Sequence, residues 1–143
     1  MNREILFRGK RKDNKGWVYG DLNQNDAHNR ISILEHGCII HAVDPETIGQ
    51  FTGLLDKEGN KIFEGDVIRS VHFKEGNKTH YLYHIVKWDN RLSGWIAQNI
   101  DTHNGNFTDQ GNPQIWVYIK NADFDIMGPI HDHPHLLNKT SNQ

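Results

Sequence analysis

The sequence predicts a mainly β protein with little helix. Its apolar residues form short runs separated by turn-forming residues, among which are 13 glycines and 4 prolines. No stretch of ten residues repeats its apolar positions with the 3.6-residue period of an amphipathic helix. With 143 residues, of which 36% are hydrophobic, the chain can bury a core as one domain or as two small lobes.

The first half of the chain predicts antiparallel strands joined by tight turns. Gly16 ends a polar segment between the first two strands and can adopt the positive φ of a hairpin turn. Pro45 ends the fourth strand because it has no amide hydrogen for a ladder. The Gly and Asx residues of segment 56–60 predict another hairpin connection, and a tight bend at Glu64–Asp66 starts a new strand. The strands expected before that bend cover residues 5–7, 17–22, 30–34, 38–43 and 47–54.

The second half predicts a meander followed by closing strands. Residues 80–88 carry bulky groups on both faces, so this strand is expected to be central or to bridge two packed layers. Residues 100–113 are rich in Asn, Asp, Gly, Thr and Gln and predict a mobile loop. Trp88 and Trp95 flank a turn, where a packed cross-strand cluster is favoured over a platform for stacked bases or a Pro-rich peptide. The strands are expected at residues 67–73, 80–88, 94–98, 116–119 and 124–127.

A basic cluster near the N-terminus contrasts with the rest of the chain. The net charge is -2, but residues 3–15 contain six basic and two acidic residues and so carry +4, which leaves -6 on the remainder. Arg8, Lys10, Arg11 and Lys12 are therefore candidate contacts to phosphate groups of nucleic acid or to an acidic surface of a partner subunit. The alternative, a solvated hairpin turn, is favoured because an acidic protein lacks the broad basic surface of a dedicated nucleic-acid binder.

Three histidines at alternating positions near the C-terminus are candidate metal ligands. They are His131, His133 and His135, and Asp132 could complete the set. In an extended strand His131 and His133 would share a face, while Pro134 bends the chain before His135. The other seven histidines form no metal-binding motif. A solvated polar tail is therefore the favoured interpretation, and no cofactor is expected.

The chain lacks a complete catalytic signature. It has no Gly-x-Ser-x-Gly elbow, no Gly-Lys-Ser/Thr phosphate loop and no Gly-x-Gly-x-x-Gly after a strand. Its single cysteine, Cys38, cannot form an intramolecular disulfide, and the neighbouring Ile39 and Ile40 predict a buried, inert thiol. A protein that is not an enzyme is therefore favoured. No run approaches the roughly 20 apolar residues that cross a bilayer, and no signal peptide is recognisable, so we expect a cytoplasmic protein without a membrane partner.

Motifs along nearly the whole chain are similar to those of a known family. The most distinctive are Ile48–Leu54, Asp56–Gly59 and Ile62–Ile68. Further similar segments are Arg3–Lys10 and Trp17–Gly20 near the start and Phe124–Ile130 and Pro134–Leu137 near the end. In this combination the chain resembles the YopX family of phage and prophage proteins. These motifs specify turns and strand starts rather than chemistry.

The resemblance implies a rudimentary β-barrel lobe in residues 1–60 and an SH3-like β-barrel lobe in residues 61–143, in a protein that forms homo-oligomers. The function that we expect is that of a non-enzymatic phage or prophage accessory protein in the host bacterial cell. It would act by self-association or by docking a phage or host macromolecule. The alternatives are a nucleic-acid-associated protein that uses Arg8–Lys12 and a metal-dependent hydrolase built on the C-terminal histidines.

Overall fold

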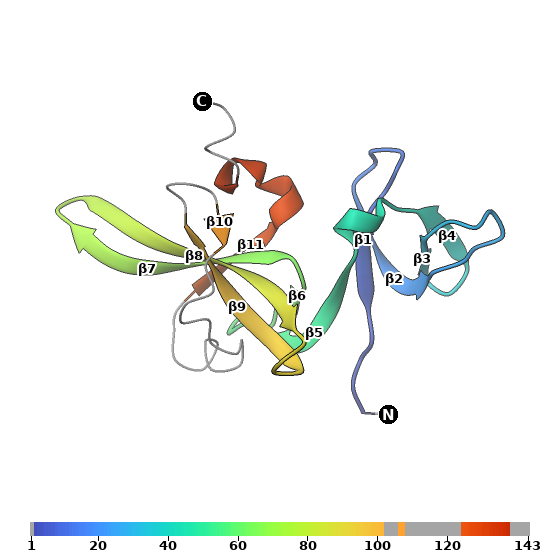
Figure 1. Cartoon of the computed structure of the whole chain (residues 1–143), viewed down its shortest axis with the longest axis horizontal. Coiled ribbons are helices and arrows are strands. Elements are labelled where there is room, and N and C mark those ends of the chain that lie inside the picture. The colour runs from blue at the N-terminus through green and yellow to red at the C-terminus, as the bar shows by residue number, and fades with distance from the viewer. Residues whose placement is uncertain (1, 102–105, 108–123, 138–143) are drawn as a thin grey trace. The chain divides into compact units, whose positions relative to one another are not determined.

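The computed structural model of the chain describes residues 2–101, 106–107 and 124–137 (Figure 1). Contacts divide the chain into two compact units, Met1–Phe63 and Glu64–Gln143. Each unit is built on one antiparallel sheet, and the helical segments in the described ranges are single turns of 3-10 helix. The prediction of a mainly β protein is confirmed. No helix in the described part is long and apolar enough to cross a membrane.

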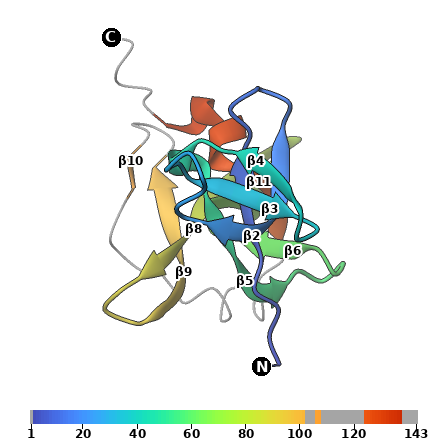
Figure 2. The ribbon, with the colours of Figure 1, turned by 90° about the vertical axis from the view of Figure 1, so that its right-hand side faces the viewer.

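The first unit contains a six-stranded sheet of short strands (Figure 2). Asn14 and Gly16 turn the first hairpin with φ of 62° and 100°, so Gly16 has the positive φ that the sequence predicted. Pro45 begins a 3-10 turn, η1 (Pro45–Thr47), in which the Glu46 amide donates to the Asp44 carboxylate at 3.1 Å. Across the sheet the strands are β4 (Ile39–Ala42), β3 (Ser32–Glu35), β2 (Trp17–Asn23), β1 (Phe7–Lys10), β5 (Gly49–Leu55) and β6 (Lys61–Phe63).

This sheet curls back on itself around a small core. Arg11 and Val43 form an isolated antiparallel bridge, and the Lys12 amide donates to the Ala42 carbonyl at 3.0 Å, so the end of β4 meets the first hairpin. Val18, Ile33 and Val43 are buried inside the curl. One bridge does not make a strand pair, and β6 pairs only with β5 among the described strands. The sheet therefore approaches a barrel without closing into one.

Two glycines permit the tight curl. A Cβ on Gly20 would lie 2.1 Å from the Leu34 carbonyl oxygen, and a Cβ on Gly9 would lie 2.9 Å from the Cβ of Val43. Real Cβ atoms do not come that close to a backbone oxygen. To make room for one, β2 and β3 would have to move apart, and this would break the hydrogen bonds between the two strands. The close approach of β2 to β3 therefore requires glycine at position 20.

The second unit contains a five-stranded sheet of longer strands. Val67, Ile85 and Ile100 on one face pack with Ile130 and Leu136. Ile68, Val86 and Ala97 are also buried, so β8 has buried residues on both faces and lies between two strands, as predicted. Across the sheet the strands are β10 (Asn106–Phe107), β9 (Gly94–Asp101), β8 (Lys78–Asp89), β7 (Asp66–Glu75) and β11 (Phe124–Pro129), and the 3-10 turns η2 (Ile130–Asp132) and η3 (Pro134–Leu136) follow.

Some details of the second unit differ from the expectations. Its described strands form an open sheet, because β10 and β11 lie at opposite edges, so the closed form of an SH3-like barrel is not observed there. Strand β9 runs to Asp101 and pairs with β10, which places strands inside the predicted loop 100–113. The rest of that loop and the expected strand 116–119 lie outside the described residues. Strand β6 pairs with β5, and contacts group it with the first unit.

Candidate functional site

The four basic residues of the N-terminal cluster differ in how far they are buried. Arg8 is 4% exposed, and its guanidinium carbon lies 5.2 Å from the ring centroid of Trp17 and 4.9 Å from that of Phe63. These cation–π distances show that Arg8 packs within the first unit. Lys10 is partly buried, and its amide donates to Thr47 Oγ1 at 2.8 Å. Arg8 is therefore not placed to contact a partner, whereas Arg11 and Lys12 extend into the adjacent turn.

The hairpin turn fixes the side chain of Arg11. The Arg11 amide donates to the Gly16 carbonyl at 2.9 Å, and the Lys15 amide donates to Asp13 Oδ1 at 3.0 Å. Asp13 Oδ2 in turn accepts a hydrogen bond from Arg11 Nη2 at 2.6 Å. Partial desolvation alone would raise the pKa of Asp13, but the hydrogen bonds from Lys15 and Arg11 lower it below its usual value. The carboxylate is thus ionised at neutral pH and engages one side of the guanidinium.

A polar hollow of about 380 Å³ lies beside this turn, and we call it the Arg11 hollow. The first hairpin supplies one wall and strand β4 another. The side chain of Arg30, from the loop before β3, completes it. Its lining residues are Arg11, Lys12, Asp13, Arg30, Ile40, His41 and Ala42. The sequence-based candidates included Arg11 and Lys12 but missed Arg30 and His41, because only the curl of the sheet brings these residues together.

A buried carboxylate holds Arg30 in position. The side chain of Asp26 is 2% exposed, and its Oδ2 accepts a hydrogen bond from Arg30 Nε at 2.6 Å. Its Oδ1 accepts hydrogen bonds from the amides of His28 and Arg30 at 2.8 and 3.2 Å. Burial alone would raise the pKa of Asp26, but these hydrogen bonds lower it. Arg30 is therefore held through its Nε.

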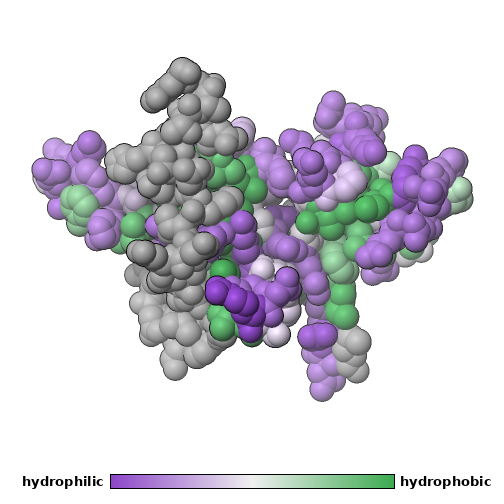
Figure 3. Space-filling model, viewed as in Figure 1, coloured by the Kyte–Doolittle hydropathy of each residue, from purple (hydrophilic) through white to green (hydrophobic). Residues whose placement is uncertain are grey.

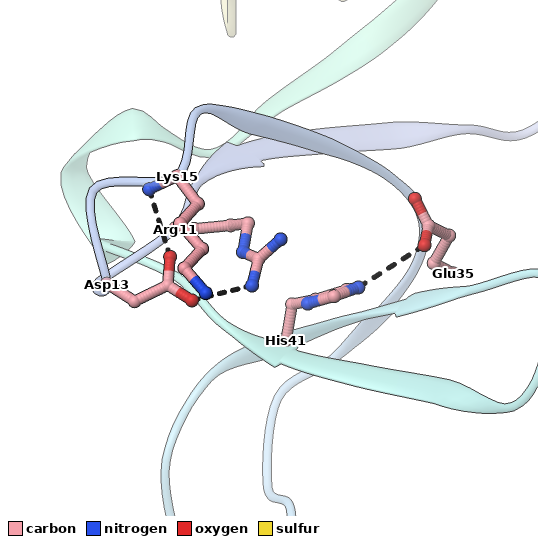
Figure 4. Close-up of polar contacts among 5 residues, drawn as sticks. All are labelled: Arg11, Asp13, Lys15, Glu35 and His41. Carbon is pink, nitrogen blue, oxygen red and sulfur yellow. Dashed lines mark hydrogen bonds and ion pairs between the residues drawn. The ribbon is translucent and has the colours of Figure 1, made fainter.

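Arg11 and His41 lie between two carboxylates in Figure 4. The Arg11 guanidinium is directed at Asp13, whereas His41 Nε2 lies 3.3 Å from Glu35 Oε1. His41 comes from β4 and Glu35 from the end of β3, so this contact also fixes the β3–β4 hairpin. The arrangement places cationic and hydrogen-bonding side chains around an open hollow, and these groups can bind an anion.

The C-terminal histidines lie on 3-10 turns instead of the extended strand considered from the sequence. His131 is in η2, His135 is in η3, and His133 joins the two turns. His133 Nε2 donates to the Met127 carbonyl at 2.6 Å, and its ring packs edge-to-face on His135 at 5.7 Å between centroids. Within the described ranges, no group of three His, Cys, Asp or Glu side chains is arranged to hold a metal ion.

Cys38 is exposed, so the prediction of a buried thiol is wrong. It follows His36 and Gly37, which turn the β3–β4 hairpin with φ of 52° and 73°. The neighbouring Ile39 and Ile40 are exposed as well, because β4 is an edge strand. Apolar neighbours therefore did not indicate burial at this position.

The predicted packing of Trp88 on Trp95 is confirmed, with the rings edge-to-face at 5.1 Å across β8 and β9.

The end of the β7–β8 hairpin is a second candidate site. Residues 71–82, which we call the β7–β8 arm, project beyond the rest of the sheet at the left of Figure 1. Strand β11 pairs with β7 only as far as Ser70, and β9 pairs with β8 only from Tyr83 onward. Among the described strands, the two strands of the arm therefore pair only with each other.

The β7–β8 arm exposes large apolar side chains. Val71 is 53% exposed, Phe73 47%, Tyr81 37% and Leu82 37%. Val71 pairs with Tyr81, whereas Phe73 pairs with His80 and stacks on its ring at 4.2 Å. Because adjacent strand residues point to opposite faces, apolar groups are present on both faces of the arm. Figure 3, drawn in the same view as Figure 1, shows hydrophobic surface among hydrophilic surface on the projecting arm.

These features define a two-unit, mainly β protein with a polar hollow in the first unit and an exposed apolar hairpin in the second. A comparison with known families matches residues 6–138 to the family described as YopX protein. The chain therefore belongs to the YopX family, as its motifs predicted. No curated protein matches the chain.

Proposed function

We propose that this protein is a non-enzymatic phage or prophage accessory protein of the host cytoplasm, and that it acts by self-association through the β7–β8 arm. The observation that supports this proposal is the exposure of four large apolar side chains on a hairpin that projects beyond its sheet. A two-stranded hairpin alone is marginally stable in water. Burial of the arm against another surface would remove its apolar groups from water and stabilise it.

The form of the arm favours contact through side chains over open-ended strand addition. A register shift between Val71 and Phe73 interrupts the β7 side of the arm, and Lys74 and Lys78 flank its tip. Bulges and lysines are devices that prevent exposed strand edges from pairing without limit. The side-chain faces carry no such protection. We therefore expect a closed assembly in which the apolar faces are covered.

The charges of the arm suit a second copy of the same chain as its partner. Lys74, Glu75 and Lys78 put both signs of charge near the tip, and His80 Nε2 lies 3.3 Å from Glu75 Oε2. A surface of mixed sign can meet its own copy without the like-charge repulsion that a one-sign surface would suffer. The twelve residues of the arm are fewer than the 20–30 that a standard interface uses on each side, so further surface of the second copy must also be covered.

Light scattering coupled to size exclusion, over a series of concentrations of the full chain, tests this proposal. We expect a mass of two or more copies for the native protein. Phe73→Ser should weaken association by roughly tenfold or more, because buried aromatic side chains often dominate interface energies. Leu92→Ser is the matched control, since Leu92 is similarly exposed, at 51%, but lies on the β8–β9 turn.

Two results would overturn self-association through the arm. The first is a native protein that is monomeric at every concentration. The second is an equal loss of association in Phe73→Ser and Leu92→Ser. This result would show that association depends on exposed apolar side chains in general and not on those of the arm.

A further inference from the structure

We propose that the Arg11 hollow is a binding site for a phosphate group. This inference concerns the first unit and does not rest on the self-association of the β7–β8 arm. Three cationic side chains line the hollow, Arg11, Lys12 and Arg30, and Asp13 is the single carboxylate among the lining residues. Cations from two separate turns thus face one space, which solvent can enter.

Each cation retains hydrogen-bonding capacity for a ligand. Lys12 is exposed and forms no ion pair with any described residue. Arg30 contacts Asp26 through Nε, and within the described residues its two terminal nitrogens form no hydrogen bond or ion pair. Two parallel N–H groups of a guanidinium match two oxygens of a phosphate, which is why arginine recognises phosphates so often.

The buried carboxylate of Asp26 gives this site a preorganised element. Its contact at 2.6 Å restricts the Arg30 side chain before any ligand arrives, so less conformational entropy is lost on binding. A long surface arginine without such a partner would lose that entropy when it binds. Asp26 is not among the residues that line the hollow.

The carboxylate of Asp13 would compete with a bound phosphate for the Arg11 side chain. It accepts the hydrogen bond from Arg11 Nη2, in an ion pair whose members are both partly exposed. Exposed pairs of this kind are weak, and a phosphate carries more negative charge than one carboxylate. A bound phosphate can therefore take over Arg11, and removal of the Asp13 charge should strengthen binding.

The hollow has room for more than the phosphate itself. At about 380 Å³ it exceeds the space of a single ion, since one water takes about 30 Å³ in the liquid. The exposed side chain of Ile40 provides an apolar wall beside the cations. The phosphate can belong to a free nucleotide or to a nucleic-acid backbone, and these two sources share the same recognition chemistry.

Isothermal titration calorimetry on the full chain at low salt tests the site with three probes: inorganic phosphate, a nucleoside monophosphate and a short single-stranded oligonucleotide. Lys12→Gln should weaken binding by about threefold to tenfold through the loss of one charged contact. Asp13→Asn should strengthen it by about threefold. Arg91→Gln is the matched control, because it removes one positive charge from a side chain that is 88% exposed in the second unit.

The probes also distinguish the sources of phosphate. Binding of the oligonucleotide alone indicates a nucleic-acid backbone, and its logarithmic affinity should then fall with a salt slope of roughly -0.7 per phosphate contacted. Binding of the mononucleotide or of inorganic phosphate indicates a free ligand. The inference fails if none of the probes binds, if Lys12→Gln has no effect, or if Arg91→Gln weakens binding as much as Lys12→Gln does. Neither Lys12→Gln nor Asp13→Asn should change the mass measured by light scattering, so this test is independent of the arm.

Discussion

The two units build different surfaces from the same kind of antiparallel sheet. In the first unit, strands β1, β3 and β4 have four residues each, and the curled sheet brings hairpin turns from distant parts of the sequence together. In the second unit, β7 has 10 residues and β8 has 12, and both run past the strands that flank them. The turns of the first unit thus meet at the Arg11 hollow, whereas the long strands of the second unit extend into the apolar arm.

The difference shows how strand length and pairing decide what a sheet exposes. Where short strands end, the backbone amides of the following loops need hydrogen-bond acceptors outside the sheet. The carboxylates of Asp13 and Asp26 accept hydrogen bonds from such loop amides. Where a strand continues without neighbours, its side chains keep the alternation of a sheet but have nothing to cover them. Loops at the ends of short strands thus position charged side chains, and strands without neighbours expose apolar ones.

The largest expected effect tests the tight curl of the first unit. Gly20→Ala places a Cβ against the Leu34 carbonyl oxygen, and we expect it to lower the free energy of unfolding by about 3 kcal/mol. Urea denaturation followed by circular dichroism measures this change. Gly94→Ala in β9 is the control, because its Cβ would meet its nearest atom at an ordinary 3.7 Å, and it should change the free energy by less than about 1 kcal/mol. Equal effects of the two substitutions would show that the first sheet is no more tightly packed than the second.

The sequence predicted those parts of the fold that depend on local chemistry. The positive φ of Gly16, the break at Pro45 and the central position of β8 follow from single residues or from short patterns. The family motifs likewise identified the chain, because they lie at turns and strand starts.

The sequence could not predict what depends on contacts between distant segments. Arg8 stands in a row of basic residues, yet it is buried, and its guanidinium packs against the rings of Trp17 and Phe63. Arg30 lies in a polar loop with no pattern of its own, and only the meeting of that loop with the first hairpin places it in the Arg11 hollow. The candidate site was therefore half predicted, through Arg11 and Lys12.

An intermediate effect concerns the pH dependence of the first unit. Because hydrogen bonds from Arg30 and the His28 amide lower the pKa of Asp26, against the effect of desolvation, its carboxylate is more acidic folded than unfolded. It thus contributes stability above the unfolded-state pKa of about 3.9, and this stability is lost as the pH falls through the folded-state pKa. Asp26→Asn should lower the melting temperature at pH 7 and flatten the decline in acid.

Differential scanning calorimetry from pH 7 down to about pH 3 measures both effects. Asp125→Asn in the second unit is the control, because its side chain is 72% exposed and pairs with Arg69 at 3.2 Å on the surface. If Asp26→Asn and Asp125→Asn give the same pH profile, the buried carboxylate does not organise the loop that carries Arg30.

The smallest expected effect separates stability from binding at the hollow. Arg11 and Asp13 form an exposed ion pair, and such pairs commonly contribute nothing measurable to folding because water screens them and both side chains lose entropy. A double-mutant cycle of Arg11→Gln and Asp13→Asn, measured by urea denaturation, should therefore give a coupling energy within error of zero. A clear coupling would mean that the pair holds the hairpin turn together, and a ligand that took over Arg11 would then destabilise the first unit. Without coupling, an external anion can replace Asp13 as the partner of Arg11 while the surrounding sheet stays unchanged. In the same way, the β7–β8 arm can be covered without rearranging the core beneath β7 and β8.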